Sequence, residues 1–311
     1  MQVIDLNNFD LIVVSGPDAR KFLQGQVTCD LEQLSSEHSL TGSICNLKGR
    51  VISDFRLVEH NGECYLLMAA GMAAIVLPVL SKYIVFSKAE CRLATETLQR
   101  TGFIGGEAEA DLSQRFSGIP PAAGDVIATD CELLLRIPGS TPRFEHWQFN
   151  AAGEPPASRL AGLSTDTSSN SWELEDIKAG IVHITPDLSE QQLPEALNYD
   201  LSGIINFRKG CYTGQEIIAR MYYRGTAKKR LYHGVAAKQN AKPGSIECEI
   251  DAGQEALSGE ILRCAQDSQR DWHVLAILPV AVEEETSRVY LDRDPQALVT
   301  LQSLPYRAGR D

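Results

Sequence analysis

The sequence lacks the motifs that hold metals or nucleotides. Its eight cysteines are scattered singly with no CxxC pair, so we predict neither a zinc site nor an iron–sulfur cluster held by the chain itself. The six histidines form no HxH or HExxH arrangement, and glycine motifs for dinucleotides or triphosphates are absent. The sequence therefore predicts no metal ligands and no nucleotide cofactor.

Long hydrophobic runs and a targeting leader are also missing. No apolar run reaches the roughly 18 residues that a membrane span needs. The first residues, MQVIDLNNFD, do not have the cationic and then apolar pattern of a signal peptide. We expect a cytoplasmic protein without a membrane partner, in a reducing compartment where most of the cysteines pack as small apolar groups. We also expect a monomer.

Positive charge is in the minority. Lysine and arginine number 29 against 41 acidic residues, and the formal net charge is −12. This balance argues against a broad nucleic-acid-binding surface, which relies on clustered cations. Segments such as RKGC and TAKKRLY could still line a local basic groove for a small anionic ligand.

The 311 residues favour two or three domains, with strands and helices mixed in an α+β arrangement. Asn61-Gly62 between two apolar runs predicts a β-hairpin, and a helix is expected over 72–84, broken or bent near Pro78. From residue 228 onward, short strand-like runs recur about every ten residues, which is typical of a small antiparallel barrel. We predict one region over residues 1–227 and a C-terminal β-barrel over 228–311.

The segment KGCYTGQE carries the best candidate for chemistry. Cys211 follows Lys209 and precedes a helix expected from Gln215 to Tyr223, with Thr213 and Glu216 spaced as a capping box. A helix N-terminus and a nearby cation both favour a thiolate, so Cys211 is the strongest candidate for a reactive thiol. The alternative is a structural cysteine beside a turn, which is the more frequent case on spacing alone.

KGCYTGQE with the trailing Arg220, preceded by LPEALNYDLSGIINF, resembles the YgfZ family, folate-binding relatives of the glycine-cleavage T-protein. Further segments are similar over nearly the whole chain: LQGQVTCDL (23–31), NLKGRVISDF (46–55), AGIVHITPDL (179–188), RGTAKKRLYHG (224–234) and LPY (304–306).

The resemblance implies a T-protein-like (GcvT-like) aminomethyltransferase fold, with interleaved N-terminal α+β domains around a central channel and a C-terminal barrel. It implies tetrahydrofolate or a one-carbon derivative in that channel, with Cys211 as the residue on which function depends. It also implies iron–sulfur enzymes or assembly factors as partners, and an indirect link to tRNA modification.

Two positions depart from the T-protein pattern. Where the T-protein has an acidic pair, this chain has Ser53 and Asp54, so one carboxylate suited to acid–base work is missing. Where the T-protein places a glutamate that can hold the pterin, this chain has Lys178, which cannot accept the same hydrogen bonds. Ordinary aminomethyl transfer is therefore not the expected activity.

The remaining candidates for ligand binding lie around a tight turn, at Trp172, and in or near the helices. Residues around a tight Lys-Gly turn could pair with a folate carboxylate, the alternative being a solvated hairpin tip. Trp172 could stack on a pterin, the alternative being a core residue. With the motif and its helix, the candidates for folate contact are Asn46, Lys48, Arg50, Asp54, Trp172, Lys178, Tyr212, Gln215, Glu216 and Arg220, and the catalytic candidates are Cys211 and Lys209.

Three functions remain open at this point. The first is an accessory factor that uses a folate and Cys211 to maintain iron–sulfur proteins. The second is a folate-dependent one-carbon transferase or demethylase, which the serine at position 53 disfavours. The third is a non-catalytic module that senses folate and docks to a client enzyme.

Overall fold

The computed structural model describes residues 1–116, 118–149, 160, 162–166, 168–237, 244–250, 256–284 and 286–306. The chain divides into two compact units, each built from separated segments. Unit 1 comprises Met1–Ser169, His183–Gln192 and Gly203–Ile217, and unit 2 comprises Asn170–Val182, Leu193–Ser202 and Ile218–Asp311. The described part of the predicted C-terminal region, 228–311, lies wholly in unit 2.

Unit 1 contains two five-stranded antiparallel sheets. The order of the first is β3 (Leu40–Cys45), β4 (Val51–His60), β5 (Glu63–Ala69), β2 (Phe9–Ser15) and β6 (Glu90–Leu93). The order of the second is β1 (Gln2–Asp5), β7 (Leu98–Ile104), β10 (Arg143–Phe149), β9 (Glu132–Ile137) and β8 (Val126–Ala128).

Local sequence explains how these strands form. The apolar run Leu11–Val14 of β2 is fully buried, as expected for an inner strand covered on both faces. Asn61 and Gly62 both have positive φ and join β4 to β5 by a two-residue turn, with His60 opposite Glu63. The predicted Asn-Gly hairpin is therefore confirmed.

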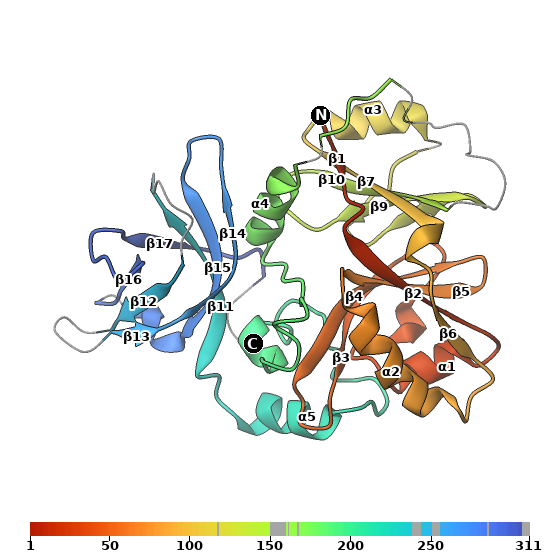
Figure 1. The fold of residues 1–311 in the computed structure, drawn as a ribbon, viewed down its shortest axis with the longest axis horizontal. Coiled ribbons are helices and arrows are strands. Elements are labelled where there is room, and N and C mark those ends of the chain that lie inside the picture. Colours follow the sequence, from red (N-terminus) through yellow and green to blue (C-terminus); the bar gives the residue numbers. More distant parts are fainter. Residues whose placement is uncertain are drawn as a thin grey trace. The chain divides into compact units, whose positions relative to one another are not determined.

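Helices α2 (Ala73–Ile84) and α3 (Ala108–Arg115) pack on different sheets of unit 1 (Figure 1). Helix α2 contacts β2, β4 and β6. It runs through Pro78 without interruption, so of the predicted break or bend the break is wrong. Helix α3 buries Ala108 and Leu112 against Phe103 and Phe144 of the second sheet. The short helices are α1 (Ala19–Gln24), η1 (Leu31–Gln33) and η2 (Thr95–Thr97).

Unit 2 is mainly antiparallel β-structure. Its four-stranded sheet has the order β14 (Glu260–Gln266), β15 (Trp272–Pro279), β11 (Lys229–Ala236) and β17 (Val299–Gln302). Its three-stranded sheet has the order β13 (Leu257–Ser258), β12 (Ile246–Glu249) and β16 (Arg288–Leu291). One apolar cluster draws on both sheets, so they share a core. The short antiparallel strands predicted for a small barrel are present, in two sheets.

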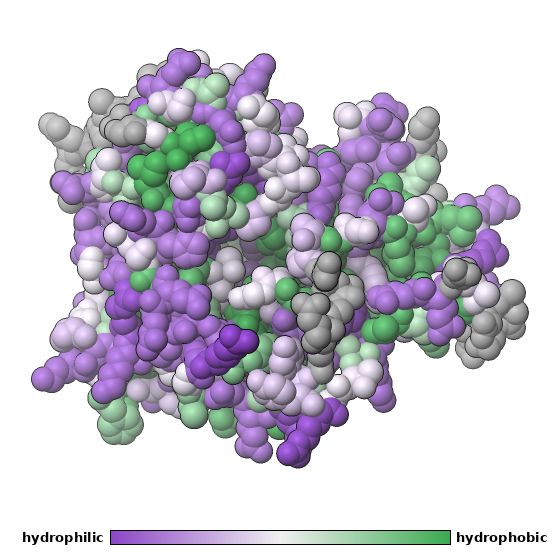
Figure 2. Space-filling model, turned by 180° about the vertical axis from the view of Figure 1, so that it is seen from behind, coloured by the Kyte–Doolittle hydropathy of each residue, from purple (hydrophilic) through white to green (hydrophobic). Residues whose placement is uncertain are grey.

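The helices of unit 2 are α4 (Asn170–Ala179), η3 (Pro194–Leu197) and η4 (Val280–Glu283), and α5 (Gln215–Arg224) begins in unit 1 and continues into unit 2. Helix α4 packs on β14 and β15 (Figure 1). Among the described residues, no helix is both long and apolar enough to cross a membrane. Hydrophilic side chains cover most of the surface seen in Figure 2.

A buried polar network holds the middle segment of unit 2 to β11. The Arg230 guanidinium donates to both carboxylate oxygens of Asp200, at 2.7 and 3.0 Å. The Asn198 side chain donates to the Leu231 carbonyl oxygen at 2.8 Å, and Asn198 itself has the left-handed φ of +57°. The family-like segments NYDLSG and AKKRLYHG are thus joined by structural bonds.

Two buried histidines of unit 2 give its stability a predicted pH dependence. His233 Nε2 lies 2.9 Å from His273 Nδ1. Burial, with the neighbouring His273 and Lys178 charges, lowers the pKa of His233 from 6.5 to about 4. Because the unfolded state then binds the proton more tightly, stability present above pH 6.5 is lost as the pH falls through 4, by up to about 3.5 kcal/mol (about 2.5 units at about 1.4 kcal/mol each).

Urea unfolding at a series of pH values measures this effect. We expect the His233→Gln variant to lose part of the slope between pH 6.5 and 4 that the unmodified chain shows. An identical slope in the two proteins would show that His233 does not contribute to it.

Candidate functional site

The KGCYTGQE segment forms a loop in unit 1 that leads into α5. Cys211 is exposed, whereas Lys209 and Tyr212 on either side of it are buried. All eight cysteines are free thiols, and only Cys211 and Cys131 among them are exposed. The sulfur singled out from the sequence is therefore open to solvent rather than sealed in apolar packing.

Lys209 binds the backbone of another segment of unit 1. Its Nζ donates to the carbonyl oxygens of Gln24, Val27 and Cys29 at 2.8, 2.7 and 2.6 Å. Burial lowers the pKa of Lys209 to about 8. No hydrogen bond joins Lys209 to Cys211, although both are described, so the geometry gives Lys209 the task of fastening the loop. Its predicted catalytic part stays a prediction.

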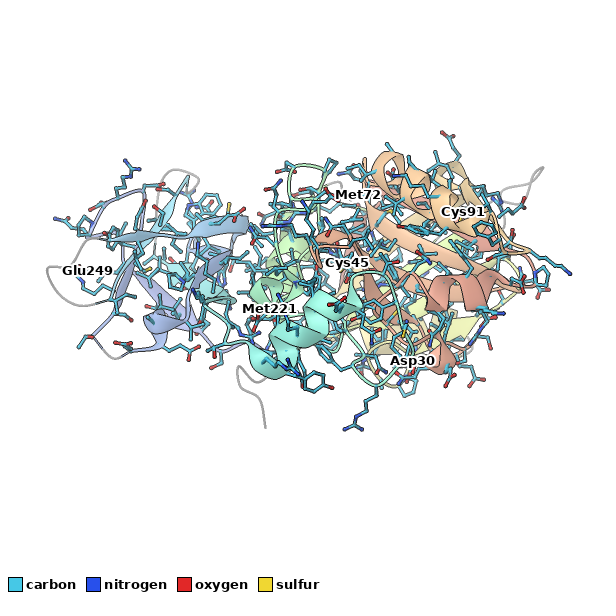
Figure 3. All side chains as sticks on the ribbon, turned by 90° about the horizontal axis from the view of Figure 1, so that it is seen from below. Asp30, Cys45, Met72, Cys91, Met221 and Glu249 are labelled. Carbon is cyan, nitrogen blue, oxygen red and sulfur yellow. The ribbon has the colours of Figure 1, made fainter. Side chains whose placement is uncertain are left out.

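Asp30, labelled in Figure 3, makes hydrogen bonds next to the segment 24–29 whose carbonyl groups bind Lys209. The Asp30 carboxylate accepts hydrogen bonds from Gln24 Nε2 at 2.8 Å and from Asn206 Nδ2 at 3.4 Å. Asp30 also caps η1 by accepting the Glu32 N–H. The segment that binds Lys209 is thus itself held by hydrogen bonds of the Asp30 carboxylate.

Lys209→Ala is expected to lower the free energy of unfolding by about 2–3 kcal/mol, because three carbonyl groups lose a charged donor. Arg208→Ala is the matched control, since this neighbouring cation is exposed, and its effect should stay within about 0.5 kcal/mol. Urea unfolding provides the measurement. Equal midpoints for the two variants would show that the carbonyl contacts of Lys209 contribute nothing net.

The start of α5 differs from the predicted capping box. The Tyr212 N–H donates to Gln215 Oε1 at 3.3 Å, whereas the Thr213 hydroxyl donates to Gln26 Oε1 at 3.3 Å. Neither bond is that of the predicted Thr213–Glu216 capping box; Gln215, the first residue of α5, instead holds the loop before the helix at Tyr212. The Tyr212 ring also lies 5.3 Å from Lys209 Nζ, and its buried hydroxyl has no hydrogen-bond partner among the residues that the structure describes.

Gly214 brings the motif against the turn between β3 and β4. Its φ is +84°, and a Cβ at this position would lie 2.5 Å from the Asn46 carbonyl oxygen and 3.3 Å from the Cβ of Cys45, which Figure 3 labels. Only glycine allows both this backbone conformation and this close approach. The glycine of KGCYTGQE is therefore a packing requirement.

The structure places the predicted residues of the Lys-Gly turn beside this contact. Asn46 Oδ1 accepts the N–H groups of Lys48 and Arg50, at 2.9 and 3.0 Å, and its Nδ2 donates to Glu190. The Arg50 guanidinium donates to the Gln191 carbonyl oxygen. Lys48 and Arg50 are exposed, so the turn is a hairpin tip that carries two cations next to the cysteine loop.

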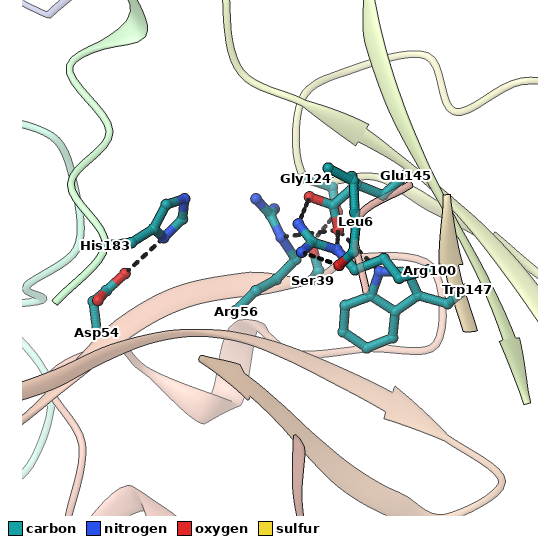
Figure 4. Close-up of polar contacts among 9 residues, drawn as sticks. All are labelled: Leu6, Ser39, Asp54, Arg56, Arg100, Gly124, Glu145, Trp147 and His183. Carbon is teal, nitrogen blue, oxygen red and sulfur yellow. Dashed lines mark hydrogen bonds and ion pairs between the residues drawn. The ribbon is translucent and has the colours of Figure 1, made fainter. Parts of the chain in front are cut away.

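Asp54 projects from β4 toward the segment 183–192. Its Oδ1 accepts the Ile184 N–H at 2.6 Å, and its Oδ2 lies 3.3 Å from His183 Nδ1 (Figure 4). The neighbouring Ser53 points to the other face of the strand, and its hydroxyl donates to the Asp54 carbonyl oxygen. The histidines show no metal-binding motif in the sequence, and the pairing of His183 with Asp54 was not predicted from it.

Arg56, Arg100 and Glu145 form a buried ion cluster (Figure 4). Arg56 lies on the same face of β4 as Asp54, because the two are separated by two positions in the strand. Arg100 donates to both Glu145 oxygens, at 2.9 and 2.6 Å, and Trp147 Nε1 donates to one of them at 2.9 Å. Burial alone would raise the pKa of Glu145, but the charges of Arg100 and Arg56 and these hydrogen bonds lower it to about 2. The cluster joins β4, β7 and β10 within unit 1.

The other candidates belong to unit 2 or to the exposed part of α5. Trp172 is buried in α4, in agreement with the reading of a core residue. Lys178 donates to Glu175 Oε1 at 2.8 Å within the same helix. Glu216 and Arg220 are exposed on α5. Unit 1 thus contains Cys211, Lys209, Tyr212, Gln215, Glu216, Asn46, Lys48, Arg50 and Asp54, and unit 2 contains Trp172, Lys178 and Arg220.

The described residues contain no cluster of three or more potential metal ligands. No model of a known protein family matches the chain. Its fold is similar to a crystal structure of the glycine cleavage system aminomethyltransferase T from Bartonella henselae, with a TM-score of 0.78 and 18% identity over 98% of this chain and 85% of that one. The predicted α+β aminomethyltransferase-like fold is confirmed.

Sequence comparison finds relatives of nearly the same length. The chain is 34% identical over 310 residues to the tRNA-modifying protein YgfZ of Pectobacterium atrosepticum, covering 98% of this chain and 91% of the relative. It is 31% identical over 315 residues to the protein of that name from Photobacterium profundum, covering 98% and 92%. The chain belongs to the family of tRNA-modifying proteins YgfZ.

Proposed function

We propose that this chain binds tetrahydrofolate or a one-carbon derivative and uses Cys211 to support the assembly or repair of iron–sulfur proteins. Through such clients it contributes indirectly to tRNA modification. The observation that carries the proposal is one exposed thiol on a loop fastened at both ends, by the carbonyl contacts of Lys209 and the close packing of Gly214. A fastened loop presents the sulfur in one defined place to a client protein.

Unit 1 carries the hydrogen-bond acceptors and the cations that recognition of a folate requires. The ligand carries N–H donors on its pterin ring and carboxylates on its glutamate tail. Asp54 can accept from such donors, and the exposed cations Lys48 and Arg50 can pair with carboxylates. Among the described residues, the Tyr212 hydroxyl is a buried polar group without a hydrogen-bond partner, and such groups are often satisfied by a ligand or water.

A folate-dependent one-carbon transferase is the second candidate. The T-protein uses an acidic pair, and here Ser53 turns away from Asp54 and bonds to backbone. A single carboxylate remains where the pair would act as acid and base. This arrangement favours the accessory role over ordinary aminomethyl transfer.

Isothermal titration with tetrahydrofolate and with its formyl and methylene forms tests the proposal. We expect at least one form to bind with a dissociation constant in the micromolar range, about −8 kcal/mol. Absence of heat with all three forms at millimolar concentration would reject the folate part of the proposal.

A further inference from the structure

A group of apolar side chains is exposed where helix α2 ends. Tyr83 is 40% exposed, Val85 68% and Phe86 95%, and we call these three residues the apolar tip. Figure 1 shows the segment that follows α2 at the periphery of unit 1. Because an aromatic side chain has about 150–250 Å² of surface, the tip exposes roughly 350 Å². Patches of this size on a single chain are often functional.

Hydrogen bonds hold the backbone that presents the tip. The Ser87 N–H donates to the Ile84 carbonyl oxygen at 2.8 Å. The Lys88 N–H donates to Asp18 Oδ2 at 2.8 Å, and the Lys88 carbonyl oxygen accepts the Asp18 N–H at 3.2 Å. Phe86 thus extends into solvent from a fixed turn, so this backbone is already ordered before any partner binds.

Two lysines flank the apolar tip. Lys82 and Lys88 are exposed, and neither side chain forms an ion pair within the part of the chain that the structure describes. Between residues 64 and 89 these lysines are the only charged residues of the sequence. The segment is therefore locally cationic in a chain whose net charge is −12.

The elements that adjoin the tip, by hydrogen bonds or by chain continuity, are α1 and β6. Arg20 of α1 pairs with Glu59, and Arg92 of β6 pairs with Glu63, so these pairs add no net charge. The remaining charged groups of this surface are the cations Lys21, Lys82 and Lys88 and the acids Asp18 and Glu90. The cations outnumber the acids by one, so this surface does not repel an anionic partner as the chain as a whole does.

This composition favours a lipid bilayer over a protein as the occupant. Lysine is depleted at protein interfaces. At a bilayer, lysine stems lie along apolar groups while the ammonium groups reach the lipid phosphates, and tyrosine is enriched at the headgroup level. The missing membrane partner was predicted from the absence of an apolar span, and a surface anchor needs no span.

We propose that the apolar tip and its two lysines form a reversible anchor for an anionic membrane surface. Phe86 and Val85 enter the boundary of the acyl chains, and Tyr83 lies among the headgroups. Lys82 and Lys88 bind the lipid phosphates. An anchor of this size gives weak and reversible binding. The inference depends neither on folate binding nor on the chemistry of the cysteine loop.

Flotation of the full chain with vesicles tests the anchor. The probes are vesicles of phosphatidylcholine alone, and vesicles of phosphatidylcholine mixed with an equal amount of phosphatidylglycerol. The unmodified chain should float with the mixed vesicles, with a partition coefficient about tenfold above that for phosphatidylcholine alone. High salt should reduce this preference, because it screens the lysines.

The variants separate the apolar and the charged contributions. Phe86→Ser should weaken binding to the mixed vesicles about tenfold or more, because the largest inserted group is lost. Lys82→Gln and Lys88→Gln should each weaken it about fivefold and leave binding to phosphatidylcholine alone unchanged. Leu298→Ser is the matched control, because Leu298 is an exposed apolar residue of unit 2, and it should bind as the unmodified chain does.

Failure of the unmodified chain to float with either kind of vesicle would reject the anchor. Equal partitioning of the unmodified chain and the Phe86→Ser variant would reject the role of the tip, and equal partitioning into the two kinds of vesicle would reject the role of anionic lipid. No flotation, combined with lost cellular activity of Phe86→Ser, would assign the tip to a protein partner instead. Titration with tetrahydrofolate is independent of these results, so the proposed function is tested separately.

Discussion

Cys211→Ser is expected to abolish the cellular activity of the chain and to leave its fold and folate affinity unchanged. Serine keeps the size and hydrogen-bonding capacity of the side chain and removes the soft nucleophile. Because Cys211 is exposed, the free energy of unfolding measured in urea should change by less than about 0.5 kcal/mol. The measurement is the content of methylthiolated nucleosides in tRNA from a bacterial strain that lacks its own YgfZ and carries the variant.

Cys131→Ser is the control for this experiment. Cys131 is the other exposed cysteine and lies between β8 and β9, outside the motif. Loss of activity with both variants would indicate a general need for thiols. Full restoration by the Cys211→Ser variant would contradict the accessory role through sulfur chemistry and favour a module that binds folate and docks without chemistry.

Glu145→Ala is expected to cost about 3–5 kcal/mol of stability. Removing one partner of a buried ion cluster leaves the remaining charges without compensation. Here the carboxylate accepts hydrogen bonds from Arg100 and Trp147 and forms an ion pair with Arg56 at 3.9 Å, and it is 1% exposed. A loss of this size approaches the whole stability of many domains, so the variant should be partly unfolded at 37 °C.

Urea unfolding followed by circular dichroism measures the change, with Glu109→Ala as control. Glu109 forms an ion pair with Arg136 that is partly exposed, and such pairs contribute about 0–1 kcal/mol. Equal losses for the two variants would show that burial of the Glu145 cluster adds nothing to its contribution.

The parts of the fold with local causes were predictable from the sequence. Asn61-Gly62 specifies its hairpin because both residues accept positive φ. The short strands of the C-terminal region follow from alternating apolar residues and regular turns. The position of Cys211 in a loop just before a helix was also predicted, and α5 begins at Gln215 as expected.

The missed features depend on long-range placement. Asp54 and His183 are 129 positions apart, and no local pattern indicates that they meet. Lys209 donates to backbone carbonyl oxygens. Because every residue has a carbonyl group, the sequence cannot indicate which residues accept these bonds. The predicted capping box does not form, because the Thr213 hydroxyl donates to Gln26 instead.

Because each unit is built from separated segments, the chain cannot be divided into two folded fragments at one position. A fragment that ends at Ser169 would contain both sheets of unit 1 and would lack the segments 183–192 and 203–217 that complete it. Asp54 would lose its Ile184 partner, and the carbonyls of residues 24, 27 and 29 would lose Lys209. Neither half can be produced faithfully as a truncated protein, and a single proteolytic nick near residue 200 should release no autonomous domain.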